Sequence, residues 1–155
     1  MRTNIDIIET VKLCINKPTQ KCCSRALYSI VILLWYLINS KINGIEWMTT
    51  RELCNNARFR NCNEARTYLY RLKKRGIVET SKIYTSETIW RIKEEVLKKM
   101  DPRTLLRLFT LHYNMCTEYY KTGNLRKPVE DVEEEEEEFE EEEFEEEDWE
   151  DIEEE

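Results

Sequence analysis

The chain has 155 residues, with 24 Lys and Arg against 32 Asp and Glu, and a formal net charge of −8. Residues 129–155 hold 21 of the acidic residues and no basic one, so residues 1–128 combine 24 basic with 11 acidic residues and carry +13. The basic part favours a polyanionic partner, whereas an almost purely acidic run buries too little apolar area to fold, and we expect residues 129–155 to be disordered when unbound.

Several classes of protein are disfavoured by the composition. The chain has one histidine, His112, no glycine-rich loop and no Gly-x-Ser-x-Gly motif, so we expect no enzyme. Its six cysteines form no Cys-x-x-Cys pair, so the sequence predicts neither a metal nor another cofactor. The longest apolar run, Ala26–Ile38, is too short for a bilayer and no signal peptide is visible. We therefore expect a cytoplasmic, nucleoid-associated protein with no membrane contact.

Most of the cysteines are expected to be small core residues with free thiols. A disulfide from Cys14 to Cys22 or to Cys23 is conceivable if the source is a hyperthermophile. The scarcity of Gly and Pro and the heavy use of Ile, Lys, Arg and Glu lean toward a thermophilic source, such as an archaeon or its virus.

The first third of the chain predicts two helices. Residues 4–15 place isoleucine and valine at three- and four-residue steps, which is helical spacing, and Pro18 ends the pattern. Ser24 then begins a long helix that runs to about Asn39, before a stop at Gly44. This helix is apolar nearly all round, so it should lie at the centre of the core or in a dimer seam.

Two short helices with N-terminal caps follow. Thr49 and Glu52 fit a capping box, in which the hydroxyl caps the helix and the carboxylate reaches back to the first amide. The same arrangement is predicted for Asn61 and Glu64, and Gly76 ends the second helix with a left-handed residue. The second helix should bury one face, formed by Ala65, Tyr68, Leu69 and Leu72.

The remaining elements are a hairpin and two helices. Residues that favour β-structure predict a two-stranded hairpin over Ile77–Ile92, with its tip within residues 81–87. A helix follows over about residues 93–100. Asp101 then caps the last helix and Pro102 begins it. Gly123 ends that helix, whose apolar stripe includes His112 as an expected core or interface residue.

The order helix, capped short helix, capped basic helix, glycine and hairpin resembles the winged helix-turn-helix family of DNA-binding domains. The resemblance rests on Thr49–Val78, TTRELCNNARFRNCNEARTYLYRLKKRGIV, with its capped Glu-Leu start and its Leu-x-x-Leu-x-x-x-Gly-Ile-Val run. It covers roughly residues 24–100 and implies a mainly α (α+β) fold with double-stranded DNA as partner. One departure is the hairpin tip, which offers only Lys82 where wings of this family usually carry a glycine or several bases.

DNA contact is predicted for the side of the second capped helix opposite its core face. A helix in the major groove needs a buried face and a face of long donors, and the cations here far outnumber the one acid, Glu64. The resemblance places base-reading positions at Asn63, Arg66, Thr67 and Tyr70. The other predicted DNA contacts lie on the same face, around the preceding helix and in the hairpin: Arg71 and Lys74; Arg51, Arg58 and Arg60; Lys82 and Tyr84.

Aromatic residues recur every five positions in the acidic tail, at Phe139, Phe144 and Trp149. A tail that served only solubility would have no use for them. Three functions compete: the tail folds back on the basic face and competes with DNA, contacts a basic protein surface such as the transcription machinery, or mimics DNA in a basic cleft of another protein.

We expect an N-terminal helix in residues 1–22, a winged-helix domain in 23–100, a C-terminal helix in 101–128 that could form a dimer interface, and the tail. The sequence favours a sequence-specific DNA-binding regulator of transcription, with a homodimer reading a palindromic site. The alternatives are a winged-helix protein-interaction module or DNA mimic that inhibits or recruits a nucleic-acid enzyme such as RNA polymerase, and a packaging protein that coats DNA.

Overall fold

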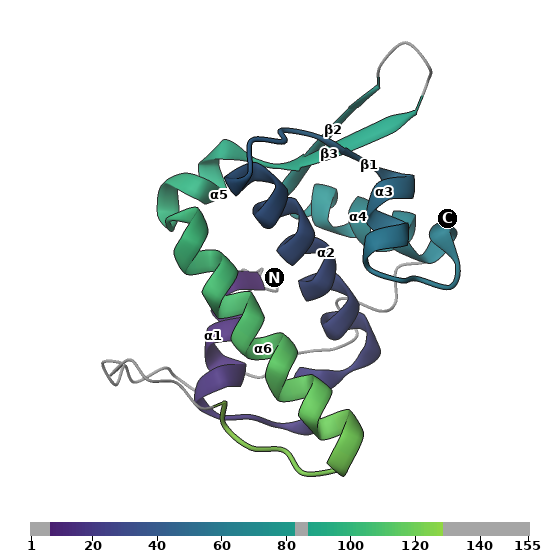
Figure 1. Cartoon of the computed structure of the whole chain (residues 1–155). Helices are drawn as coiled ribbons and strands as arrows, with labels where there is room; N and C mark the ends of the chain where they lie inside the picture. The colour runs from purple at the N-terminus through teal and green to yellow at the C-terminus, as the bar shows by residue number, and fades with distance from the viewer. Residues whose placement is uncertain (1–6, 83–86, 129–155) are drawn as a thin grey trace, which may run out of the picture.

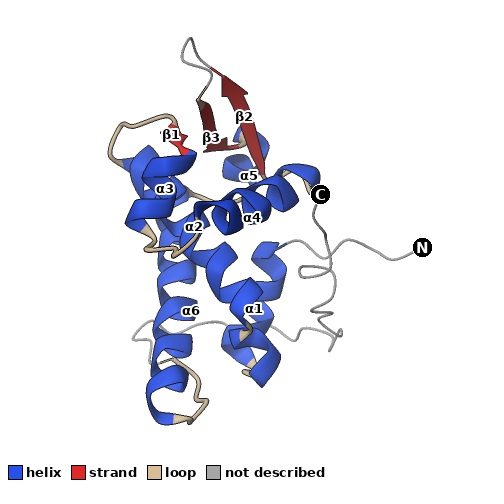
Figure 2. Cartoon of the chain, turned by 90° about the vertical axis from the view of Figure 1, so that its right-hand side faces the viewer, coloured by secondary structure: helices blue, strands red, loops and turns tan. Residues whose placement is uncertain are grey.

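The computed structural model describes residues 7–82 and 87–128, which form a mainly helical fold with one small antiparallel sheet (Figure 1). In chain order the elements are α1 (Ile7–Asn16), the 3₁₀ helix η1 (Gln20–Cys23), α2 (Arg25–Ile42), β1 (Met48–Thr49), α3 (Thr50–Asn56), α4 (Cys62–Lys74), β2 (Val78–Lys82), β3 (Thr88–Ile92), α5 (Glu94–Lys99) and α6 (Pro102–Thr122). The sheet, α3 and α4 lie at one end of the molecule, whereas α1 and the C-terminal half of α6 lie at the other (Figures 1 and 2).

Helix α2 is the centre of the core, as its all-round apolar sequence predicted. It contacts α6, α4, α3, β3 and η1. Its N-terminus is capped by the Ser24 hydroxyl, which accepts a hydrogen bond from the Leu27 amide at 3.1 Å. By length and composition alone α2 could also cross a membrane, with a mean hydropathy of 1.2, but the buried core helices of other folds share this property.

The long helix α6 packs its apolar stripe against α2, α1 and η1. Its inward residues are buried: Leu105, Phe109, His112, Met115 and Cys116. The Asp101 carboxylate caps the helix by accepting from the Thr104 amide at 3.2 Å, and Gly123 ends it with φ 79°, both as predicted. The apolar surface of α2 and α6 that suggested a dimer is thus used within the chain, and the homodimer stays a prediction without that support.

The sheet has the order β1-β3-β2, with both pairs antiparallel. Strands β2 and β3 form the predicted hairpin, in which Val78 pairs with Ile92 and Lys82 with Thr88. The tip, with the predicted DNA contact Tyr84, lies outside the described residues. Strand β1 was not predicted, because two residues are too few to show a periodic pattern and Thr49 already served as a helix cap.

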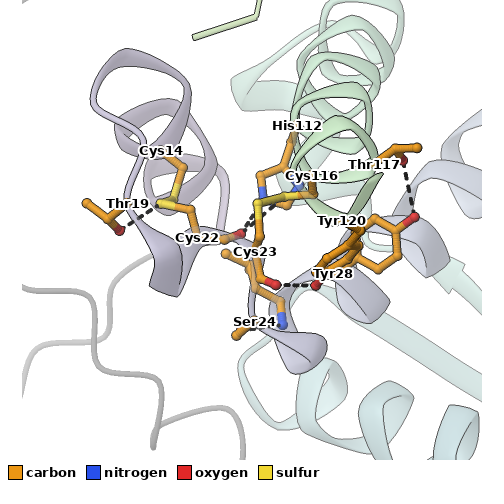
Figure 3. The surroundings of a disulfide bond; sticks show 11 residues. Cys14, Thr19, Cys22, Cys23, Ser24, Tyr28, His112, Cys116, Thr117 and Tyr120 are labelled. Atoms are coloured by element: carbon orange, nitrogen blue, oxygen red, sulfur yellow. Dashed lines mark hydrogen bonds between the residues drawn. A yellow bond between two sulfur atoms is a disulfide. The ribbon is translucent and has the colours of Figure 1, made fainter. Parts of the chain in front are cut away.

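All six cysteines form disulfides, so the expectation of mainly free thiols was wrong, although five of the six are buried in the core as predicted. Cys14–Cys22 is one of the two pairings considered from the sequence, whereas the other two disulfides, Cys23–Cys116 and Cys54–Cys62, were not predicted. The adjacent residues Cys22 and Cys23 bridge to different helices, which ties η1 to α1 on one side and to α6 on the other (Figure 3). A sequence alone offers no geometry with which to choose such partners.

His112 lies beside this pair of disulfides and is fully buried, which confirms its predicted core position (Figure 3). Its Nε2 donates to the backbone carbonyl of Cys22 at 2.8 Å. Burial lowers the pKa of His112 to about 4, against a smaller opposing effect of that hydrogen bond. Its Nδ1 has no hydrogen-bond partner among the described residues, so a proton added there would be buried without an acceptor.

The acidic tail, residues 129–155, lies outside the described residues, and so do its aromatic residues Phe139, Phe144 and Trp149. The core itself joins the three segments expected before the tail. Residues from α1, α2, α3, α4, the sheet and α6 belong to one cluster of buried side chains.

Candidate nucleic-acid interface

Helix α3 begins with the predicted capping box. The Thr49 hydroxyl accepts from the Glu52 amide at 3.0 Å, and the Glu52 carboxylate accepts from the Thr49 amide at 2.9 Å. Two orphan amides are satisfied in this way, which fixes where the short helix starts. Its inward residues Leu53 and Cys54 are buried, so Arg51 is left on the solvent side.

Helix α4 is capped differently from the prediction. The Asn61 side chain accepts from the Asn63 amide at 2.9 Å, as a cap should. Glu64 does not reach back to complete a box: its carboxylate instead pairs with Arg25 at 3.0 Å. This ion pair places the N-terminus of α2 beside the first turn of α4, because Arg25 is the first residue of α2.

The core face of α4 is the predicted one, formed by Ala65, Tyr68, Leu69 and Leu72. Arg71 was predicted to face DNA, and that was wrong. It is buried, with 6% of its surface exposed, and its guanidinium carbon lies 5.1 Å from the centre of the Tyr68 ring. Arg71 follows Tyr68 by one helical turn, so its long side chain packs back along the ring instead of extending into solvent.

The outer face of α4 carries most of the other predicted residues. Asn63, Arg66, Tyr70 and Lys74 are exposed, and Thr67 is half-buried. Arg66 donates from Nη2 to Oδ1 of Asn63 at 2.8 Å, so these two side chains are held together at the start of the helix. The Thr67 hydroxyl donates to the Asn63 carbonyl at 2.9 Å, which leaves only its oxygen lone pairs for a ligand.

Lys73 also lies on this face, although nothing in its spacing distinguished it from the neighbouring basic residues. It is exposed, and its Nζ lies 5.9 Å from the centre of the Tyr70 ring. Tyr70 itself is 44% exposed and makes an edge-to-face contact with Trp90, with the ring centres 5.0 Å apart. An exposed lysine beside an exposed aromatic ring is suited to a phosphate and to an apolar sugar or base surface.

Trp90 joins three elements of the interface at one point. Its ring is fully buried on β3 and contacts Tyr70 on α4. Its Nε1 donates to the Thr50 hydroxyl at the start of α3, at 2.8 Å. One buried side chain thus contacts α3, α4 and the hairpin and helps to fix their relative placement.

The loop between α3 and α4 presents two of the predicted phosphate contacts, Arg58 and Arg60, and both are exposed. Arg51 lies 3.9 Å from Glu87 in a weak ion pair, with 74% of its side chain exposed. Lys82 is exposed at the end of β2, next to the undescribed tip.

The acidic residues near the sheet are engaged elsewhere. Arg91 binds Glu79 at 2.7 Å and Glu46 at 2.9 Å, and Lys41 lies 3.5 Å from both Glu46 and Glu94. Within residues 7–82 and 87–128, no carboxylate forms an ion pair with any of five interface cations: Arg58, Arg60, Arg66, Lys73 and Lys74. Among the described residues, the outer face of α4 and its preceding loop thus carry positive charge that no carboxylate pairs with.

Comparison with protein-family models, with curated proteins and with solved structures finds no match. Function must therefore be argued from the geometry. Across the described part of the chain, no group of three His, Cys, Asp or Glu side chains is placed to hold a metal ion. What the interface offers is an array of exposed cations, with one exposed aromatic ring, on a helix that is anchored by its opposite face.

Proposed function

We propose that residues 24–100 form a winged helix-turn-helix domain that binds double-stranded DNA through α4, in the control of transcription. The order α2, β1, α3, α4, β2, β3 supports this proposal, since a capped helix pair is followed directly by a hairpin. The observation that carries it is the outer face of α4, where exposed cations have no ion-pair partner among the described carboxylates. Such a face attracts a polyanion by releasing its counterions.

The contacts divide by type. Asn63 and Arg66 lie in the first turns of α4, where base edges come within reach of a groove-bound helix, and on binding they exchange their mutual hydrogen bond for bonds to bases. Lys74, Lys73 and the loop arginines bind phosphates, which adds affinity without sequence information. Arg71 takes no part, because it is buried against Tyr68.

The three disulfides bear on where such a protein works. Disulfides persist in oxidising compartments, and also inside the cells of hyperthermophiles. A DNA-binding role fits the interior of a hyperthermophile's cell. The amino-acid composition, which leans toward a thermophilic source, supports the same setting.

The proposal is tested by Arg66→Ala with Lys74→Ala, measured as affinity for selected duplex sequences over a range of salt concentrations. The matched control is Lys98→Ala with Arg103→Ala, which removes the same charge from exposed residues of α5 and α6. We expect the α4 variant to lose sequence preference and to flatten the slope of log affinity against log salt by about 1–2. The control variant should keep the sequence preference and the salt slope of the wild type.

Other results would favour the alternatives. Equal weakening on all sequences supports a protein that coats DNA without reading bases. Unchanged DNA binding in the α4 variant rules out α4 as the contact. If biological activity then depended on residues 129–155, the protein-interaction module or DNA mimic would replace our proposal.

We further propose that the acidic tail weakens DNA binding by competing for the same cations. The tail carries 21 negative charges, and its tether gives it an effective concentration in the millimolar range. Removal of residues 129–155 should tighten DNA binding severalfold at low salt and steepen its salt dependence. Equal affinity with and without the tail would exclude this competition and leave a basic protein surface as its partner.

A further inference from the structure

The disulfide Cys54–Cys62 differs from the other two in position and in exposure. It joins the end of α3 to the first residue of α4, within the proposed interface. Cys62 is an exposed residue, whereas all four cysteines of the other two disulfides are at least 97% buried. Of the three, Cys54–Cys62 is therefore the disulfide that a thiol in solution can reach.

This disulfide closes the loop that presents Arg58 and Arg60. Within the loop, the Phe59 amide bonds back to the Cys54 carbonyl at 3.0 Å and the Arg58 amide to the Asn55 carbonyl at 3.2 Å. These two bonds are those of a Schellman motif, the usual end of a helix. The loop is thus held by the helix end on one side and by the disulfide on the other.

Arg58 occupies the position of that motif where glycine is normally found. Its φ is 61°, and it is the one non-glycine residue with a positive φ in the described part of the chain. Helix α4 ends in the same way but uses Gly76, with φ 78°. A side chain kept in a strained backbone conformation points to a function for that side chain, and the strain persists where the surroundings over-determine the conformation.

We propose that Cys54–Cys62 is a positioning element of the DNA interface: it holds Arg58 and Arg60 beside α4 for phosphate contact, and its reduction by a dithiol weakens DNA binding. The inference rests on the proposed DNA-binding function. It makes the affinity of this interface sensitive to redox state through one bond, while the two buried disulfides keep the fold.

The reduction proceeds by ordinary thiol–disulfide exchange. A thiolate of the dithiol attacks Sγ of Cys62, the Sγ–Sγ bond breaks, and Cys54 leaves as a thiolate that takes up a proton. The second thiol of the reagent then displaces Cys62, so the reagent is oxidised to its disulfide and two electrons pass to the protein. The reduced Cys54 finds a hydrogen-bond acceptor nearby, because the Phe59 carbonyl oxygen lies 3.8 Å from its Sγ.

The test uses the full chain and a matched pair of variants. Cys54→Ser with Cys62→Ser opens the interface disulfide, and Cys14→Ser with Cys22→Ser opens a disulfide of the same sequence separation, 8 residues, at the other end of the molecule. Equal loop lengths predict similar losses of thermal stability. DNA affinity is measured over a salt series, and the oxidised wild type is titrated with dithiothreitol while alkylation and mass spectrometry identify the cysteines that react.

We expect the Cys54/Cys62 variant to bind DNA about tenfold more weakly, with a salt slope flattened by about 1–2, while the Cys14/Cys22 variant binds as the wild type does. In the titration, Cys54 and Cys62 should be alkylated first, and the loss of DNA affinity should follow their alkylation. Equal affinity of the two variants, or earlier alkylation of Cys14 and Cys22, overturns the inference and leaves DNA binding intact. If the oxidised wild type binds no duplex DNA, the inference fails together with the proposed function.

Discussion

The two ends of the molecule use the same kinds of residue for opposite purposes. At the end formed by α1, η1 and α6, two disulfides, His112 and the Cys22 carbonyl are buried together (Figure 3). At the end formed by α3, α4 and the hairpin, the disulfide has an exposed cysteine. The cations of the outer face of α4 and of the preceding loop have no ion-pair partner among the described carboxylates. Two buried disulfides secure the first end, whereas the second carries the cations that we propose for DNA contact.

This difference indicates a division of labour within one core. A surface that presents uncompensated cations is destabilised by their mutual repulsion. One hydrophobic core links both ends, so the stability that the two disulfides of the α1–α6 end contribute can offset the destabilising repulsion at the α4 end. Changes at the α1–α6 end should therefore alter stability and leave DNA binding alone, whereas substitutions of charged residues at the α4 end should alter DNA binding with little effect on stability.

The largest effect is expected from removing the disulfide with the longest loop. Cys23→Ser with Cys116→Ser opens a bridge of sequence separation 93, which should lower the free energy of unfolding by roughly 4–5 kcal/mol, against roughly 2–3 kcal/mol for a bridge of separation 8. Urea unfolding of the oxidised wild type and of each disulfide variant measures these two losses of stability. DNA affinity under folding conditions should not change, and a parallel loss of DNA affinity would break the division between the two ends.

Burial of His112 should make the α1–α6 end sensitive to acid. Its folded pKa of about 4 lies below the ordinary 6.5, so the unfolded chain binds more protons between these values. The contribution of His112 is fully present above pH 6.5 and is lost as the pH falls toward 4, by up to about 3 kcal/mol. In urea unfolding from pH 7 to 4, His112→Gln should lose less stability than the wild type does. Parallel profiles for the two proteins would show that the imidazole is not kept neutral by burial.

The smallest change in stability is expected at the α4 end. Glu64→Gln removes the carboxylate that pairs with Arg25, whose side chain is 74% exposed, so the free energy of unfolding should change by less than about 1 kcal/mol. DNA affinity at low salt should rise roughly twofold to tenfold, because a negative charge is lost and Arg25 is freed for a phosphate. Weaker DNA binding by Glu64→Gln would mean that the ion pair with Arg25 positions α4 for DNA contact and does not reduce DNA affinity.

The sequence predicted the helices and their ends well, because local chemistry decides them. The Thr49–Glu52 box, the Asp101 cap and the glycine stops depend on residues a few positions apart. Strand β1 was not predicted, because it forms only by pairing with Trp90 and Ile89, about forty residues away in sequence.

At the interface, the errors arose where tertiary contacts compete with helical spacing. Arg71 lies at the edge of the buried stripe, and its side chain packs against Tyr68 in the folded chain, which helical spacing alone does not reveal. Glu64 was predicted to complete a capping box, but its carboxylate pairs with Arg25 of α2, a helix that lies far from α4 in sequence and close to it in space. The disulfides likewise depend on which helices meet, which no spacing of cysteines reveals.

Amide hydrogen exchange of the full chain, with and without duplex DNA, can separate the two ends in one experiment. We predict that DNA increases protection in residues 57–74 and at the base of the hairpin, while exchange in α1 and in α6 is unchanged. Protection confined to α6, or DNA binding with no change in α4, would contradict the assignment of the DNA interface to the α4 end.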